Sequence, residues 1–131
     1  MRLDEFLAYL AEEPGWVDVG RVGITSRDSS GDSPLHAALW AGDDEAARAL
    51  VDAGADVNAP GEMSETPLHV AVAQGNTAMA RHLLDHGADW DTVSELGFSA
   101  RQRALSAKDV ELRKLAQGPE RGRPAGSRRG D

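Results

Sequence analysis

The strings SPLHAALWAGD and TPLHVAVAQGN, at residues 33–43 and 66–76, are near-copies separated by 33 residues. An alignment of the chain on itself at this offset also pairs Leu50 with Leu83. Self-similarity at a fixed period of roughly 20–50 residues is typical of solenoids, in which one structural unit is stacked on its copies. This repeat constrains the fold more than any other feature of the sequence.

Each copy begins with residues that can start a helix. Ser33 and Thr66 are good N-caps, and the Pro that follows each of them fits the first helical position, where no N–H is needed. The His at the third helical position, His36 or His69, can reach back to the cap as Glu does in a capping box. The Gly near the end of each string supplies the left-handed residue that ends this short helix.

A second helix is expected in each copy, beginning at Asp43 or Asp44 in the first and at Asn76 or Thr77 in the second. Each should end before the Gly of a Gly-Ala-Asp segment. Apolar residues recur at helical spacing in both helices and form one face. These residues are Ala46, Ala47, Leu50 and Val51 in the first copy and Met79, Ala80, Leu83 and Leu84 in the second.

The strings TPLHVAVAQGN, HLLDHGAD and ALVDAGADVNA resemble the ankyrin repeat, with its T-P-L-H, central Gly, paired Leu and G-A-D-x-N. The resemblance is strong over residues 28–91. It implies an all-α ankyrin-repeat solenoid of stacked helix-loop-helix-hairpin units, with loop fingers along one edge. Because two units alone would leave both ends apolar, the flanks are expected to be caps.

The expected division of the chain follows the repeat. An ankyrin-repeat domain spans residues 1–117, and a tail rich in Gly, Pro and Arg, residues 118–131, is expected to be disordered. The parts of the domain are an N-terminal cap helix and long loop (1–27), a first repeat (28–60), a second repeat (61–93) and a degenerate C-terminal cap repeat (94–117).

Both flanks have the features of caps. Residues 3–12 predict an amphipathic helix, and the loop around Trp16 is expected to cover the first repeat, with direct binding as the weaker alternative. In the C-terminal flank polar residues enter apolar positions of the repeat, as where Arg101 replaces Leu68. Side chains expected on the apolar faces of these caps are Leu3, Phe6, Leu7 and Leu10 in the first and Val110, Leu112 and Leu115 in the second.

The composition excludes several kinds of chemistry. There is no cysteine, which excludes disulfides, zinc–thiolate sites and thiol catalysis. The sequence also lacks a phosphate-binding Gly-rich loop and a zinc-protease motif, so we expect neither enzyme activity nor a cofactor. The N-terminus does not resemble a signal peptide, and no apolar run approaches the ~20 residues of a membrane span. A cytoplasmic protein that does not bind membranes is therefore expected.

Charge is unevenly distributed along the chain. Residues 1–97 carry 5 basic and 18 acidic residues, a net charge of −13, whereas residues 98–131 carry 9 and 4, a net charge of +5. An acidic body repels nucleic acid and favours a basic protein partner, although solubility alone would also explain it.

The resemblance implies binding through the finger tips and the inner surface of the first helices. Trp40 occupies such an inner position, and we expect its large, rigid side chain to anchor the partner. The alternative is that Trp40 packs against the N-terminal loop. The acidic residues of the fingers are expected to form a row that steers a basic partner, with simple solvation as the alternative. Trp90 is expected in the core. The predicted partner-binding residues are Trp40, the acidic Asp32, Glu62, Glu65 and Glu95, and Ser29, Ser30, Met63, Gln74 and Phe98.

The sequence thus predicts a non-enzymatic protein-binding module that is a monomer when free. A narrower hypothesis, based on small size and acidity, is an immunity protein or inhibitor of a toxin or enzyme, like some small bacterial ankyrin proteins. One alternative is a metal-dependent hydrolase centred on His82, His86 and neighbouring aspartates. The structural interpretation of these histidines is favoured because two ligands do not make a site and the first copy has Ala49 and Ala53 there. A third possibility is a unit that self-associates through the face carrying Trp40.

Overall fold

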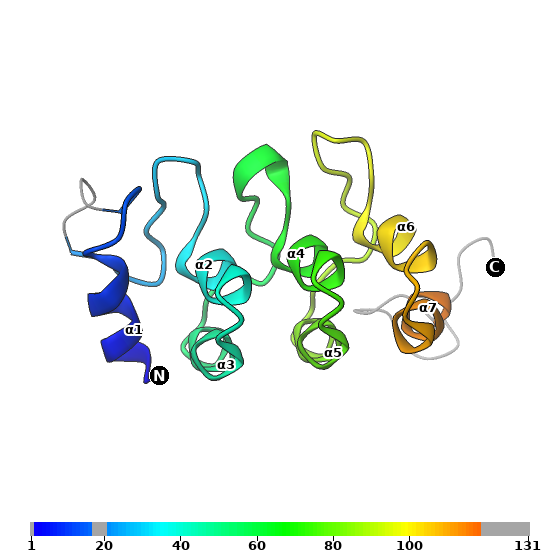
Figure 1. Ribbon diagram of the computed structural model, residues 1–131, viewed down its shortest axis with the longest axis horizontal. Helices are drawn as coiled ribbons and strands as arrows, with labels where there is room; N and C mark the ends of the chain where they lie inside the picture. Colours follow the sequence, from blue (N-terminus) through cyan, green and yellow to red (C-terminus); the bar gives the residue numbers. More distant parts are fainter. Residues whose placement is uncertain (1, 17–20, 119–131) are drawn as a thin grey trace.

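The structure is a computed structural model that describes residues 2–16 and 21–118, where the regular elements are helices (Figure 1). None of these helices is long and apolar enough to cross a membrane. The elements are α1 (Leu3–Leu10), α2 (Pro34–Trp40), α3 (Asp44–Asp52), the 3₁₀ turn η1 (Glu62–Ser64), α4 (Pro67–Ala73), α5 (Thr77–Asp85), α6 (Ala100–Leu105) and α7 (Val110–Gln117).

The helices lie in two rows (Figure 1). In the first row α2, α4 and α6 pack side by side, and in the second row α3, α5 and α7 do the same. Each first-row helix also packs on the second-row helix that follows it. Three finger loops, residues 25–33, 58–66 and 91–99, project beside the first row (Figure 1). The all-α solenoid predicted from the repeat is confirmed.

The capping predicted for the first helix of each repeat is present in detail. His36 N donates to Ser33 Oγ at 3.4 Å, and Ser33 N donates back to His36 Nδ1 at 3.2 Å. Thr66 and His69 repeat the arrangement at 3.3 and 3.0 Å. The third unit uses Ser99 with a Gln in place of the His. One local device therefore starts all three first-row helices.

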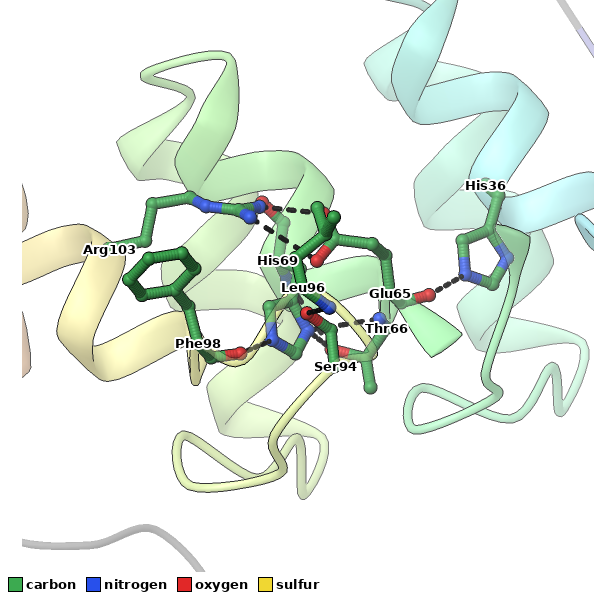
Figure 2. A network of polar contacts seen from close by, with 8 residues as sticks. All are labelled: His36, Glu65, Thr66, His69, Ser94, Leu96, Phe98 and Arg103. Carbon is green, nitrogen blue, oxygen red and sulfur yellow. Dashed lines mark hydrogen bonds and ion pairs between the residues drawn. The ribbon is translucent and has the colours of Figure 1, made fainter. Parts of the chain in front are cut away.

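The same histidines also join each unit to the next (Figure 2). His36 Nε2 donates to the carbonyl oxygen of Glu65 at 2.8 Å, and His69 Nε2 donates to that of Phe98 at 2.9 Å. Because Nδ1 accepts the N–H of the cap, Nε2 must carry the hydrogen of each neutral ring. Both rings are completely buried. Each imidazole therefore connects the start of one helix to the finger of the following unit.

The core lies between the two rows and consists largely of Ala and Leu side chains. All eight apolar positions predicted for the second helices are buried, and the most exposed of them, Val51, has 6% of its surface accessible. Trp90 is 2% exposed, which confirms its predicted place in the core. Small residues such as Ala47 and Ala80 are fully buried, and they let the backbones of neighbouring helices approach closely.

The N-terminal flank closes one end of the solenoid. Helix α1 packs against α3, and its Phe6 and Leu10 are buried in the core. Trp16 is also buried, with 3% of its surface exposed, so it covers the first repeat as predicted. Val17 and Val19 of the same predicted loop lie outside the described residues.

The C-terminal flank closes the other end with a charged side chain. The guanidinium carbon of Arg101 lies 5.7 Å from the centre of the Trp90 ring, and its Nε donates to Asp91 at 2.9 Å. Arg101 thus covers an apolar end while its charge is paired. From residue 119 onward, the tail for which we predict disorder lies outside the described residues.

One expectation for the C-terminal cap is wrong. Leu112 is buried and Leu115 packs against the core, as predicted, but Val110 is 49% exposed. The buried face of α7 is built on Leu112 and Ala116, which are four residues apart. Val110 precedes Leu112 by two residues, or about 200° of helix rotation, and so points the other way.

Gly61 lies where the second finger approaches the first repeat. A Cβ atom at this position would be 2.7 Å from His36 Nε2 and would also collide with the carboxylate of Asp32. That carboxylate accepts the N–H of Glu62 at 2.8 Å. The close approach of backbone, carboxylate and imidazole leaves room only for glycine.

We therefore expect Gly61→Ala to lower the free energy of unfolding by about 1–3 kcal/mol, the usual cost of overpacking. Urea unfolding followed by circular dichroism measures it. Gly23→Ala is the matched control, because a Cβ atom there would meet nothing within 4 Å. A wild-type midpoint for Gly61→Ala would contradict the close approach.

The burial of His36 should make the free energy of unfolding depend on pH. Burial lowers its pKa, and this outweighs the Glu65 carbonyl and the carboxylates of Asp32 and Asp28, which raise it. Below about pH 6.5 the unfolded chain takes up a proton that the folded chain resists, so stability is highest above this pH and falls as the pH drops, by at most about 1.4 kcal/mol per unit.

The variant His36→Gln tests this dependence, because Gln fills the same capping position in the third unit. Urea unfolding at pH 7, 6 and 5 should show a smaller loss of stability for the variant than for the wild type. Carboxylates contribute equally to both proteins and cancel in the comparison. Equal losses would show that His36 does not resist protonation in the folded chain.

Candidate functional site

Four large apolar side chains lie exposed on the finger side of the solenoid, and we call them the apolar row. Trp40 ends α2, Met63 lies at the tip of the second finger, and Leu96 and Phe98 belong to the third finger. Their exposed fractions are 53%, 44%, 51% and 52%. Single exposed apolar residues are normal, but a connected group of them indicates a site of interaction.

Two adjoining hollows link the side chains of the apolar row. A hollow of about 200 Å³ is lined by Trp40, Met63 and Leu96, with Val70 among the other lining residues. A groove of about 910 Å³ is lined by Leu96 and Phe98 and continues along α6 to the start of α7. Because Leu96 lines both, the hollow and the groove adjoin and form one surface.

The tip of the second finger has an unusual backbone. Met63 and Ser64 both have a φ of 59°, in the left-handed region that residues other than glycine seldom adopt. Hydrogen bonds hold this shape, from Ser64 N to the Gly61 oxygen at 3.0 Å and from Glu95 N to the Met63 oxygen at 2.9 Å. The fold thus maintains a strained turn where Met63 is presented to solvent, as is common at functional sites.

An ion pair joins the second finger to α6 beneath the apolar row (Figure 2). Arg103 Nη1 and Nη2 donate to the two carboxylate oxygens of Glu65 at 2.7 and 3.2 Å. Burial alone would raise the pKa of Glu65, but the hydrogen bonds from Arg103 and Ser94 and the charge of Arg103 outweigh it and lower the pKa below its usual value. Glu65 is therefore ionised, and Arg103 balances its charge.

The acidic row predicted along the fingers is only partly present. Glu62 and Glu95 are exposed. Asp32 is buried, with 9% of its surface accessible, because its carboxylate accepts the N–H of Glu62 inside the fold. Glu65 is neutralised by Arg103. The expectation that all four carboxylates face a partner is therefore wrong for Asp32, which is buried. The carboxylate of Glu65 faces Arg103 instead of a partner.

The remaining predicted site residues lie at the rim of the apolar row or beyond it. Gln74 is exposed, lines the groove, and donates from its Nε2 to the backbone oxygen of Trp40 at 3.3 Å. Ser29 and Ser30 are exposed on the first finger, where Ser30 bonds to Asp28. Neither serine lines the hollow or the groove.

Leu96 and Arg103 also belong to this surface, and of the two only Arg103 was missed by the sequence. The alignment at an offset of 33 pairs Leu96 with Met63 and so predicts it among the binding positions of the third finger. Arg103 aligns with Val70, a buried position, and an Arg at such a position signals a paired carboxylate nearby. The identity of that carboxylate depends on packing between units and is not visible in the sequence.

A separate cluster lies on the second row of helices. One donor atom of each of Asp52, His82 and His86 lies within 4.8 Å of the other two. Burial and the charges of Arg48 and His86 lower the pKa of His82, so its ring is neutral near pH 7. The sequence grouped the two histidines with Asp85 and Asp89, which are close in sequence, and it missed Asp52 in the preceding repeat.

The missing signal is the register between second-row helices. Arg48 contacts His82, and these residues are 34 positions apart rather than 33. The same offset from Asp52 leads to His86. Residues that contact each other across neighbouring second helices are therefore separated by 34 positions, one more than the sequence period of 33.

Two family models match the chain. Residues 30–62 match the model described as "Ankyrin repeat", and residues 50–104 match the model described as "Ankyrin repeats (many copies)". Together they extend over residues 30–104, which is more than half of the chain. No curated protein shows a significant match to it.

The ion pair of Glu65 and Arg103 should contribute to stability as a unit. In a double-mutant cycle of Glu65→Gln and Arg103→Met, we expect a coupling energy of about 1–2 kcal/mol, because the pair is bidentate and largely buried. Urea unfolding of the four proteins measures it. The exposed pair of Arg2 and Asp4 is the control and should show no measurable coupling. Additive effects at Glu65 and Arg103 would contradict the structure.

Proposed function

This chain belongs to the ankyrin-repeat family, and from this premise we propose that it binds its protein partner through the apolar row and the groove beside it. Ankyrin repeats are modules of protein–protein interaction, so a protein partner follows from the family. The observation that supports this particular surface is the connected exposure of Trp40, Met63, Leu96 and Phe98 around two adjoining hollows.

Trp40 is the proposed anchor of the interface. Its ring is half exposed, and it stands over a hollow that can receive one apolar side chain of the partner. Rigid aromatic residues at the centre of an interface often contribute most of its binding energy. The backbone beneath it is also fixed, because Gln74 donates to the Trp40 oxygen. Little conformational freedom is therefore lost when a partner binds.

We further propose that the partner is partly basic. The exposed carboxylates of Glu62 and Glu95 lie at the finger tips next to Met63 and Leu96, and residues 1–97 carry a net charge of −13. Such a field raises the rate of association with a basic surface and is screened by salt. Basic side chains of the partner would contact Glu62 and Glu95, while Glu65 remains paired with Arg103.

The proposed role is binding without catalysis. Both ring nitrogens of His36 and of His69 are engaged in hydrogen bonds, so neither histidine has a free lone pair to act as a general base. The narrower proposal of an immunity protein or inhibitor, whose partner is a toxin or an enzyme, is supported by small size and acidity alone.

The test is affinity capture from a lysate of the source cells, followed by calorimetry with each captured protein after purification. We expect Trp40→Ala to weaken binding by about tenfold or more. Val110→Ala is the matched control, because Val110 is equally exposed but lies on the second row. Circular dichroism checks that both variants are folded.

The opposite result would move the binding surface. A partner that binds the wild type, Trp40→Ala and Leu96→Ser with equal affinity would exclude the apolar row. A second outcome is self-association: a dimer in sedimentation experiments that is lost in Trp40→Ala would assign the same surface to contacts between copies of this chain. Binding that does not weaken with added salt would contradict the basic partner.

A further inference from the structure

The joint between α3 and α5 contains a group of side chains that the binding role leaves unexplained. Asp52 is the last residue of α3, His82 lies in α5, and His86 is the residue that caps the end of α5. Two imidazoles and one carboxylate are ligands that zinc and similar metals accept. The three residues come from two repeats and meet on the row of helices that lies away from the fingers (Figure 1).

We propose that Asp52, His82 and His86 bind one divalent transition-metal ion, with Zn²⁺ as the representative ion. Their donor atoms lie within 4.8 Å of one another, and in a tetrahedral zinc site such atoms are about 3.3 Å apart. Asp52 and His86 are exposed, so small side-chain rotations can close the difference. Water would complete the coordination. The ion would tie α3 to α5 across the two repeats.

His86 is already oriented as a ligand. Its Nδ1 lies 2.8 Å from the backbone oxygen of His82, and since a carbonyl only accepts, Nδ1 carries the hydrogen. Nε2 therefore keeps its lone pair. Metal-bound histidines usually have this arrangement, in which the second ring N–H donates to a carbonyl or carboxylate and fixes the ring.

His82 has an unsatisfied atom that points to the same conclusion. Its Nε2 is buried and has no hydrogen-bond partner among the described residues. A buried polar atom without a partner costs free energy, and native proteins contain few of them. Because Nδ1 accepts from Arg48 here, Nε2 carries the ring hydrogen, and it becomes a ligand when this hydrogen moves to Nδ1. The joint thus contains a ligand-type side chain that the protein alone does not satisfy.

Arg48 competes with the metal for His82. In the structure its Nη1 donates to His82 Nδ1 at 3.2 Å. A metal-bound neutral imidazole has one nitrogen on the metal and a hydrogen on the other, so no lone pair remains for Arg48. Whichever nitrogen of His82 binds the ion, the contact with Arg48 is lost. Arg48 is exposed and can turn into solvent, and its charge also opposes a cation.

The ligand set indicates which ions bind. Imidazole favours Zn²⁺, Ni²⁺ and Cu²⁺, whereas Mg²⁺ and Ca²⁺ prefer sites made of oxygen atoms. We therefore expect Zn²⁺ to bind and Mg²⁺ not to compete with it. The apolar row is on the other side of the helix layers, so this proposal and the proposed partner surface can fail independently.

The test is calorimetric titration of the full chain with Zn²⁺, and with Co²⁺ followed by visible absorption as a direct probe of coordination. We expect one ion per chain. Removal of an outer-shell partner alone weakens metal binding by about 10- to 100-fold, so His86→Ala and Asp52→Asn should each weaken it by about tenfold or more. Arg48→Gln should bind more tightly than the wild type, which a merely structural contact would not do.

Asp85→Asn is the matched control for Asp52→Asn. Asp85 is the repeat equivalent of Asp52, and its charge also acts on His82, but it is not in the cluster. The control should bind Zn²⁺ like the wild type. Three results would overturn the proposal. They are equal weakening of Zn²⁺ binding by Asp52→Asn and Asp85→Asn, equal affinities of the wild type and His86→Ala, and an Arg48→Gln variant that binds no more tightly than the wild type.

Discussion

The whole structure depends on two buried imidazoles, His36 and His69, each of which bonds within its own repeat and to the next. One ring nitrogen accepts the N–H of the helix cap, and the other donates to a carbonyl of the following finger. Because a buried polar group left unpaired costs about 1–3 kcal/mol, the loss of either bond would destabilise the stack. The start of each first-row helix and the path of the next finger are thus fixed together.

This connection also positions the candidate binding surface. The carbonyls that the imidazoles hold belong to Glu65 and Phe98, at the base of the second and third fingers. With its backbone fixed from inside, Phe98 presents its ring to solvent, and Glu65 turns its carboxylate to Arg103. Exposed apolar side chains on a rigid backbone form a better binding surface than the same side chains on a mobile loop, because less freedom is lost on association.

The sequence predicted those features that depend on neighbours a few positions away or on the repeat itself. Capping by His36 and the apolar faces of the second helices belong to this class, since helix periodicity and cap chemistry are local. The predictions from the sequence were wrong or incomplete where a contact depends on how neighbouring repeats pack. The burial of Asp32 depends on the backbone around Gly61 in the following finger, and the proximity of Asp52 to His86 depends on a register of 34 rather than 33. Composition and period contain no information about either contact.

A short solenoid makes such contacts between units unusually important. In repeat proteins each unit contacts only its neighbours, so stability is close to a sum of unit and interface contributions, and a chain with two full repeats has few interfaces. In the first row each interface is satisfied by an imidazole with two partners. In the second row the contact between Arg48 and His82 leaves the other ring nitrogen buried and unpaired. The least satisfied interface is therefore the one where a bound ion would add most to the cohesion of the stack.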